Sequence, residues 1–498
     1  MKKAVFLIRT YLPIGIGGPV PSLELLYVAS QINKHFPEKY HVKMIDLGIG
    51  SRPLKDIQLE IASGRPCLVC LHAFAWEADL VHKIAALAKA EGRADIQVVV
   101  FGQLAMVAGR YLCEDPNIDY VLLGEPEWAI ADLLKVLDGG YAPSKVPGLS
   151  YKQDNGQIVM QDPVYPEDID SLAITSFAWD LIDIKAYAQY LNWNGAIKEE
   201  FYIPILTSRG CPYSCSFCCE TYDKHFRARS PENVMAEIYF LKEKFDVKEI
   251  HVFDAVFNHD IERAKAICRL LIQSGVAVSL AFPHGIRADR MTDELLHLLR
   301  QAGTYKLVYG IETAVPRLQK HIRKNLDLDA AQTVIRKTAE TGIITGGYFM
   351  LGFPTETQEE MELTIDFAVK SDLDVAAFFK MTDYNDINTI YASRLKHNAS
   401  PDAEAFDFKD VSYFSVKGSQ SDIPAAALNQ TILRAQKKFY LNWRRFWRGL
   451  RRYPRKSVYL RNFINALGLI VQAQLEESLG RGEGARHSAE SLRQNDHV

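Results

Sequence analysis

Short apolar segments alternate with amphipathic stretches along the first 140 residues of the chain. The short segments are apolar at nearly every position, which is typical of parallel strands that are covered on both faces. The longer stretches repeat apolar residues at helical spacing, and Ser22 stands where an N-cap is expected. We therefore predict an α/β fold in which residues 1–145 form a doubly wound sheet. The predicted strands are 4–9, 42–47, 67–72, 97–101 and 120–123, and the predicted helices are 22–34, 54–62, 77–90 and 127–137.

A second alternation of strand-like and helical segments occupies residues 201–390. It predicts six parallel strands with helices outside, which is a partial (β/α)6 barrel. Turn-forming residues indicate a connector at 146–200, residues 391–479 are expected to be mainly helical, and the polar tail 480–498 is expected to be disordered. The predicted strands are 202–206, 249–253, 277–281, 306–309, 346–351 and 375–380, and the predicted helices are 231–244, 261–273, 292–301, 328–341 and 358–370.

Ligands of a doubly wound sheet bind beyond the carboxyl ends of its strands. In the first domain, that edge is predicted to carry loops at 11–21, 72–76, 102–106 and 124–127. The first loop contains Gly15, Gly17 and Gly18, but no Gly-x-Gly-x-x-Gly run leads into a helix. A nicotinamide dinucleotide is therefore not expected.

Composition narrows the class of protein further. The 498 residues carry a net charge of −3, and this near-neutral balance argues against a general nucleic-acid coat. No apolar stretch reaches the roughly 18 residues of a spanning helix, and the N-terminal apolar run is too short for a signal peptide. Four of the eight cysteines fall within nine residues, which argues against a disulfide framework and favours a reducing, cytoplasmic location.

The strongest chemical signal is Cys211, Cys215 and Cys218, spaced C-x3-C-x2-C directly after a predicted strand. Three thiolates at this spacing suit one small iron–sulfur cluster and leave one iron open for a ligand. The alternative is that Cys219 closes a structural site as a fourth ligand. We favour three ligands because adjacent cysteines rarely face the same metal. Cys67 and Cys70 lie within one strand and are interpreted as core residues.

The cysteine motif resembles that of the radical S-adenosylmethionine (SAM) enzymes, in which three cysteines hold a [4Fe-4S] cluster whose open iron binds SAM. Three further segments are similar to motifs of that family and follow in the same order. They are 250–257 (IHVFDAVF), 310–313 (GIET) and 347–357 (GYFMLGFPTET). The resemblance implies a TIM-like barrel with its active site at the carboxyl ends of the strands, where these motifs fall.

The same resemblance implies a SAM site on the barrel. Asp254 and Glu312, at strand ends, would accept hydrogen bonds from the ammonium group or ribose of SAM, and Arg287 would pair with its carboxylate. The alternative for these three residues is an ordinary salt bridge at the barrel rim. Phe349 and Gly352, in the last motif, are predicted to contribute to the SAM site.

The first domain resembles the flavodoxin-like cobalamin-binding domain of cobalamin-dependent radical SAM enzymes, on segments 21–25, 45–46 and 124–127. The motif Asp-x-His-x-x-Gly is absent, so the resemblance implies cobalamin without a protein histidine on its lower face. The family's Gly-Gly-x-His segment is replaced at 101–104, and its Pro-Gly-Thr segment at 384–389. The predicted cobalamin contacts are Tyr11, Pro21, Ser22, His72, Phe74, Trp76, Gly102, Gln103, Gly124 and Glu125.

Residues 434–456 combine ten lysines and arginines with six aromatic residues and contain no Asp or Glu. Such a segment suits RNA or an anionic membrane surface. We favour instead a helix whose aromatic face caps the barrel and whose basic face is solvated.

The resemblance implies an enzyme that methylates an unactivated carbon, or phosphorus, of a small-molecule substrate. One SAM would remethylate cobalamin, and a second would yield a 5′-deoxyadenosyl radical with an electron from a donor such as flavodoxin or ferredoxin. An oxidative cyclase or ring-rearrangement enzyme of the same class is the alternative. A methylthiotransferase-like RNA modifier lacks support because no second three-cysteine cluster exists, and a purely structural iron–sulfur protein does not need an open iron. We expect no nucleic-acid partner.

Overall fold

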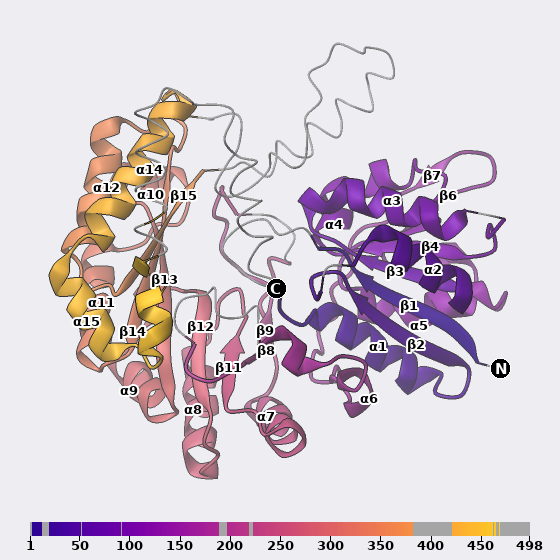
Figure 1. The fold of residues 1–498 in the computed structure, drawn as a ribbon, viewed down its shortest axis with the longest axis horizontal. Coiled ribbons are helices and arrows are strands. Elements are labelled where there is room, and N and C mark those ends of the chain that lie inside the picture. Colours follow the sequence, from indigo (N-terminus) through magenta and orange to yellow (C-terminus); the bar gives the residue numbers. More distant parts are fainter. Residues whose placement is uncertain are drawn as a thin grey trace.

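The computed structural model describes residues 2–11, 19–50, 52–90, 92–188, 197–218, 223–381, 421–461, 463–464 and 468. Figure 1 shows two parallel sheets side by side, with the first 160 residues in one lobe and the barrel in the other. The loop glycines 15–18, Cys219, residues 384–389 and the tail 480–498, for which we made predictions, lie outside the described residues. Within the described part, we find no helix with both the length and the hydrophobicity needed to cross a bilayer.

The first sheet has the strand order β2-β1-β3-β4-β5-β6-β7. Its first five strands are parallel, and this order is that of a flavodoxin-like sheet, with its topological switch point between β1 and β3. The antiparallel strands β6 and β7 extend the sheet to residue 159, beyond the predicted domain boundary at 145. The strands are β1 Lys3–Arg9, β2 Tyr40–Asp46, β3 Leu68–His72, β4 Gln97–Phe101, β5 Tyr120–Leu122, β6 Leu149–Lys152 and β7 Ile158–Val159.

Helices cover both faces of this sheet, as the apolar strands require. Helices α1 (Leu23–His35) and α5 (Pro126–Leu137) cover one face. Helices α2 (Leu54–Gly64), α3 (Ala78–Lys89) and α4 (Gln103–Leu112) cover the other. The predicted N-cap is confirmed, because the Ser22 side chain accepts a hydrogen bond from the amide of Leu25. The short helix α6 (Ser176–Trp179) lies in the connector.

The predicted loop at 102–106 is wrong. Helix α4 begins at Gln103, directly after Gly102, and its backbone is kinked at Ala108. The sequence carries the helical pattern, because Leu104, Ala105, Ala108 and Leu112 are buried on one face, and the prediction overlooked it next to Gly102. The carboxyl edge of β4 is therefore a helix start rather than an open loop.

The second sheet has the order β15-β14-β13-β12-β11-β8, with every neighbouring pair parallel. This arrangement confirms the partial barrel. The strands are β8 Ile203–Ile205, β11 Glu249–Val252, β12 Ser279–Ile286, β13 Thr304–Glu312, β14 Ile344–Leu351 and β15 Val375–Lys380, and a small hairpin joins β9 Ser208–Arg209 to β10 Arg227–Ala228. The outer helices are α7 Pro231–Phe245, α8 Ile261–Ser274, α9 Asp293–Gln301, α10 Pro316–His321, α11 Leu328–Glu340 and α12 Gln358–Lys370.

Two C-terminal helices, α14 (Ala425–Tyr440) and α15 (Trp443–Arg452), pack on the side of the barrel that faces away from the first domain (Figure 1). Phe439 of α14 is fully buried, with its ring 6.4 Å from that of Phe378 on β15. Tyr453 is buried with Ala281, Tyr305 and Ile344, near the amino ends of the strands. Helix α14 therefore covers the side of the barrel beside β15, and only α15 and the residues after it cap the end opposite to the carboxyl ends of the strands.

The predicted polarity of this cap is wrong in α15. Arg445, Arg448 and Arg452 point toward the barrel, where they bind backbone carbonyls and Asp374, whereas Trp443 and Trp447 are 69% and 49% exposed. The carbonyl groups at the ends of α12 and α11 have no partner within their helices, and they accept hydrogen bonds from Arg445 and Arg452. Satisfying these carbonyl groups outweighs the usual preference for burying aromatic side chains.

Candidate active site between the two sheets

The three cysteines lie on a loop that starts from the β9–β10 hairpin. Gly210 precedes the first of them with φ of +76°, and a β-carbon there would lie 2.0 Å from the carbonyl oxygen of His225. The loop needs glycine at this position for both reasons. The amide of Cys211 donates to the carbonyl of Asp223 at 2.9 Å, so the hairpin fixes the first cysteine.

The rest of the cysteine loop is held against the barrel rim. The amide of Ser216 donates to the carbonyl of Ile322 at 3.0 Å, and the amide of Cys218 donates to the carbonyl of Cys215 at 3.2 Å. All three cysteines are half-buried, and none of them forms a disulfide. Within the described residues, no three His, Cys, Asp or Glu side chains converge tightly enough to ligate a single ion. A four-iron cluster differs, because each thiolate binds a separate iron.

Cationic side chains surround the central cysteine. Burial raises the pKa of the Cys215 thiol, and the positive charges of Lys324 and Arg287 act in the opposite direction. Lys324 pairs with Glu312, with its Nζ 2.9 Å from Oε1. These cations favour the thiolate, which is the form that binds iron. The loop therefore fits an anionic iron–sulfur cluster, and two of the predicted SAM residues lie beside it.

Glu312 is placed by a strained turn at the end of β13. Its backbone has φ of +67°, an unusual conformation for a residue with a side chain. A β-carbon on Gly310 would come within 2.8 Å of both Glu312 Oε1 and Lys324 Nζ, so the Gly-Ile-Glu motif makes room for this ion pair. No sequence motif pointed to Lys324, which follows α10 and reaches the site through the tertiary fold.

Arg287 is already engaged by neighbours. Its Nε lies 2.9 Å from Asp289 Oδ1, and its guanidinium stacks 4.0 Å above the ring of Tyr213 in the cysteine loop. The charge of Arg287 is thus half-neutralised, while its plane is held against the loop. Asp289 and Tyr213 therefore hold Arg287 beside the cysteine loop.

Asp254 has the contacts of a structural residue. It accepts from the Thr207 amide at 2.6 Å, from the Thr207 hydroxyl at 2.5 Å and from the Ser208 hydroxyl at 2.6 Å. It therefore ties the end of β11 to the strand that leads into the cysteine loop. These contacts are neither the predicted SAM contact nor the salt bridge of the alternative, and they give Asp254 a positioning role toward the cysteine loop.

The last motif folds back on itself at the end of β14. Phe349 is fully buried and stacks on Phe378 at 5.4 Å, so its side chain packs in the outer core. Gly352 has φ of +87° and approaches Leu428 of α14. Glu356 accepts from the amides of Gly352 and Phe353 at 2.6 and 3.0 Å, and burial raises its pKa to about 7. The acidic residue of this motif is therefore a clamp for the turn.

The predicted cobalamin residues of the first domain gather at the switch point between β1 and β3. His72 ends β3, and its Nδ1 lies 3.4 Å from the Ser22 hydroxyl. Burial lowers the pKa of His72, which favours the neutral imidazole. A β-carbon on Gly102 would lie 2.7 Å from the His72 ring, so glycine is required for this close approach.

Aromatic side chains line the neighbouring loop. The rings of Phe74 and Trp76 stack with centroids 5.0 Å apart, and both side chains are half-buried. The loop is fixed by the Gln103 side chain, which accepts from the amide of Ala75 at 3.2 Å. On the other side, the Arg9 guanidinium lies 5.4 Å from the Tyr11 ring. Buried Pro21 precedes Ser22 at the start of α1. This edge presents flat, rigid surfaces of the kind that a large planar ligand requires.

Gly124 and Glu125 have other partners. A β-carbon on Gly124 would collide with the backbone of Val164 in the connector. The Glu125 carboxylate pairs with Arg227 at 2.6 Å and with Arg209 at 3.0 Å. Arg209 also pairs with buried Glu127. These contacts join the first domain to the root of the cysteine loop, a role that sequence analysis did not foresee.

The carboxyl edges of the two sheets therefore face each other. Val20, in the loop after β1, packs with Tyr202 and Phe253 at the barrel strands β8 and β11. Figure 1 shows β8 and β9 beside α1 at the junction of the two lobes. The root of the cysteine loop lies at this junction, where Arg209 and Arg227 pair with the acidic residues that follow β5.

The sequence matches the model of the radical SAM superfamily over residues 205–368. The chain is 30% identical over 374 residues to an uncharacterized methyltransferase of Pyrococcus horikoshii, covering 74% of this chain and 77% of the relative. The chain belongs to the radical SAM superfamily and is an enzyme. The [4Fe-4S] cluster and SAM are the cofactors of this superfamily, in agreement with the cysteine motif.

Two further similarities bear on the subclass. The chain is 27% identical over 340 residues to the cytidylyl-2-hydroxyethylphosphonate methyltransferase of Streptomyces wedmorensis, covering 61% of this chain and 62% of the relative. Its fold is similar to that of the radical SAM methyltransferase TsrM from Kitasatospora setae, solved with cobalamin and a [4Fe-4S] cluster bound. That structure matches with a TM-score of 0.60 at 20% identity, covering 76% of this chain and 72% of TsrM. This last likeness concerns the fold and confirms the pairing of a doubly wound domain with a barrel.

Proposed function

We propose that this enzyme is a cobalamin-dependent radical SAM methyltransferase that methylates a carbon, or phosphorus, of a small-molecule substrate. The observation that carries the proposal is the junction itself, where Glu125 and Glu127 of the flavodoxin-like domain pair with Arg209 and Arg227 at the root of the three-cysteine loop. Methyltransferase names among its relatives support the same reaction type.

On this proposal, Cys211, Cys215 and Cys218 hold the cluster, and the rim residues place SAM beside it. Glu312 and Lys324 form a buried pair that can orient the ammonium and carboxylate groups of SAM by charge. Bound there, SAM supplies a 5′-deoxyadenosyl radical and cobalamin supplies the methyl group. The task of this chain is to hold both at one junction and to exclude water.

We propose that cobalamin binds at the switch point of the first sheet. Tyr11, Phe74 and Trp76 would flank the ring, while Ser22, His72 and the close turn at Gly102 shape its lower side. Both ring nitrogens of His72 have neighbours, since Nε2 lies 3.9 Å from Glu24. This fits a cobalt without a histidine ligand from this position. Gly124 and Glu125 are committed to the domain junction.

An electron donor such as flavodoxin or ferredoxin would reduce the cluster. The seven described cysteines are all free thiols, which fits a reducing compartment such as the cytoplasm.

Cofactor content is the first test. Protein purified anaerobically with cobalamin supplied should retain about one corrinoid per chain. Cys215→Ala should lose the iron–sulfur absorbance and all SAM cleavage but keep its corrinoid. Phe74→Ala combined with Trp76→Ala should show the reverse. Cys219→Ala is the matched control from the same segment and should keep both. Full-length protein that binds no corrinoid while its cluster is intact would contradict the proposal.

Reaction type needs a second measurement. Methyl transfer by this route consumes two SAM molecules, so turnover with a substrate and a strong reductant should release S-adenosylhomocysteine and 5′-deoxyadenosine in about equal amounts. Cytidylyl-2-hydroxyethylphosphonate is a reasonable first substrate to test, because a relative bears its name. Sustained product formation without S-adenosylhomocysteine would instead support an oxidative cyclase or rearrangement enzyme.

A further inference from the structure

The outer face of α15 carries two exposed tryptophans beside two exposed arginines. We define this outer face as Trp443, Arg444, Trp447 and Arg451. At 3.6 residues per turn, these four side chains fall within an arc of about 100°. Trp443 is 69% exposed and Trp447 is 49% exposed, although tryptophan gains more than most residues from burial. Leu441, 55% exposed, continues the apolar surface at one end of the helix.

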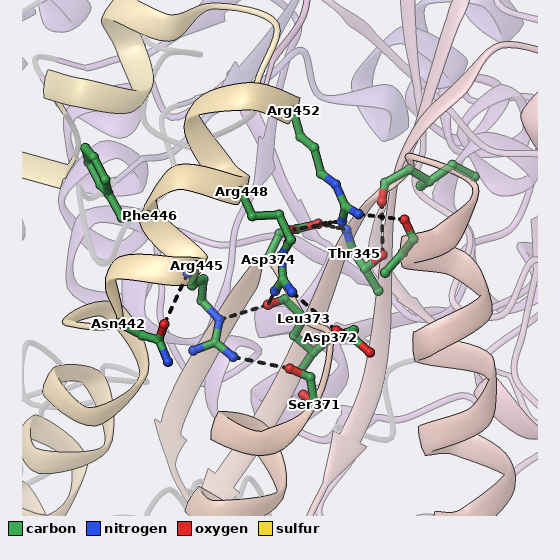
Figure 2. Close-up of polar contacts among 12 residues, drawn as sticks. Thr345, Ser371, Asp372, Leu373, Asp374, Asn442, Arg445, Phe446, Arg448 and Arg452 are labelled. Carbon is green, nitrogen blue, oxygen red and sulfur yellow. Dashed lines mark hydrogen bonds and ion pairs between the residues drawn. The ribbon is translucent and has the colours of Figure 1, made fainter.

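The inner face of the same helix makes polar contacts with the barrel, as Figure 2 shows. Arg445 donates to the carbonyls of Leu373, Phe439, Val369 and Ser371, and Arg448 and Arg452 pair with Asp374. These contacts fix the rotation of α15 about its axis. The tryptophans are therefore held outward by a well-satisfied polar interface rather than left exposed by a loose helix.

The chain segment that carries the outer face has charged residues of one sign. Residues 423–475 contain eleven lysines and arginines and no Asp or Glu. Arg444, Arg451, Lys456 and Arg461 are exposed. Leu460 and Ile464 are also exposed, at 38% and 64%, so five of the ten most exposed large apolar side chains in the described residues fall within 441–464. Such a surface is complementary to an anionic, partly apolar partner.

The outer face lies far from the proposed chemistry. Asp374, which pairs with Arg448 and Arg452 of α15, directly precedes β15. It also accepts from the amide of Thr345, near the start of β14. Helix α15 is therefore anchored at the amino ends of these strands. The cysteine loop lies at the opposite, carboxyl ends. Figure 1 also places α15 on the side of the barrel away from the first domain. A partner bound here would leave the domain junction free.

We propose that the outer face of α15 binds the surface of an anionic lipid membrane. Exposed tryptophans beside arginines suit the interfacial region, where the indole ring enters the headgroup layer and the guanidinium groups meet lipid phosphates. RNA fits less well for two reasons. Arg445, Arg448 and Arg452 already bind groups of the protein, and most of the exposed surface consists of apolar side chains. The inference does not depend on which reaction the enzyme catalyses.

The test uses the full-length holoenzyme and vesicles of phosphatidylcholine with or without phosphatidylglycerol. We expect at least tenfold more protein to co-sediment with the anionic vesicles, and this preference should fall in high salt. Tryptophan fluorescence should shift to the blue on binding. Trp443→Ser combined with Trp447→Ser should lose at least tenfold in binding, and Arg444→Gln combined with Arg451→Gln should lose the preference for anionic lipid.

The matched control removes exposed apolar side chains elsewhere. Tyr239→Ser combined with Leu363→Ser, at positions 46% and 58% exposed, should bind vesicles like the wild type. Retained cluster absorbance in every variant shows that the fold is intact. The proposal is overturned if the wild type binds neutral and anionic vesicles equally or not at all. It is also overturned if removal of 469–498 abolishes binding while the tryptophan variant retains it, or if an RNA competes the protein off the vesicles.

Discussion

Glu356 is a buried carboxyl group whose protonation is linked to folding. It is 2% exposed, and one of its oxygens accepts from the amides of Gly352 and Phe353. Burial is the main cause of its raised pKa, and the two amide hydrogen bonds only partly offset it. The turn after β14, which closes the last motif of the barrel, is thus most stable with a neutral side chain at this position.

The consequence is a pH-dependent stability with a defined sign. Between the ordinary pKa of 4.5 and the folded value of about 7, the native protein keeps a proton that the unfolded chain releases. The free energy of unfolding therefore falls as the pH rises through this window, by up to about 3 kcal/mol. Glu356→Gln keeps an oxygen for the two amides and cannot ionise, so it should lose less stability than the wild type between about pH 5 and pH 8 in urea unfolding.

Exposed Glu340→Gln is the control for this experiment and should reproduce the wild-type pH dependence. Equal pH dependence in Glu356→Gln and the wild type would show that the carboxyl group is ionised in the native state.

At the scale of elements, the C-terminal helices replace an outer helix that the barrel would otherwise lack beside β15. Arg445 secures them, and Figure 2 shows its guanidinium directed at the segment before β15. The same group donates to a carbonyl at the end of α12 and to one at the end of α14. It also stacks 3.7 Å from the ring of Phe439. One side chain therefore joins three parts of the chain: α12, the segment before β15, and α14.

Removing this guanidinium should be costly. Arg445→Met leaves several buried carbonyl groups without donors, so the free energy of unfolding should fall by about 2–4 kcal/mol. Thermal unfolding of the variant measures the loss. Exposed Arg444→Met, the neighbouring arginine, should change stability by no more than about 0.5 kcal/mol. A comparable loss in both variants would contradict the assigned role.

At the scale of the whole molecule, a buried ion-pair network joins the two domains. The Glu127 side chain is 1% exposed and Arg209 12% exposed, and Arg209 also stacks 4.8 Å from the ring of Tyr27 on α1. Because Arg209 stands two residues before Cys211, the same contact that docks the first domain also fixes the cysteine loop. The position of the first domain and the geometry of the cysteine loop are thereby connected.

Breaking this network should lower the stability of the fold, by an amount that depends on pH. Arg209→Leu leaves Glu127 buried without its cation, which should cost about 3–5 kcal/mol at neutral pH. Burial raises the pKa of Glu127 while Arg209 opposes it, so the loss should shrink at lower pH, where Glu127 takes up a proton. Adding Glu127→Leu should recover part of the stability. Thermal unfolding across pH measures both effects, and a pH-independent loss without rescue would contradict this account.

The sequence by itself determined the two alternating patterns, the N-cap at Ser22 and the cysteine loop, because each depends on residues close together in the chain. Periodicity reports which side chains a strand or helix buries, and a three-cysteine spacing reports a loop that can hold one cluster. The helix after Gly102 was missed although Leu104, Ala105, Ala108 and Leu112 repeat at helical spacing, because the glycine before it was interpreted as the start of a ligand-binding loop.

Only the tertiary structure decided which long-range partners the predicted residues meet. Glu125 pairs with Arg227 at the domain junction, and Asp254 accepts from Ser208 before the cysteine loop. Lys324 pairs with Glu312, although no sequence motif indicates this contact. The inward arginines of α15 were equally hidden, because the carbonyls and the carboxylate that attract them come from elements about 70 residues or more earlier in the chain. Hydrogen bonds and ion pairs depend on where the fold brings donors and acceptors together, and hydrophobic periodicity carries no record of that.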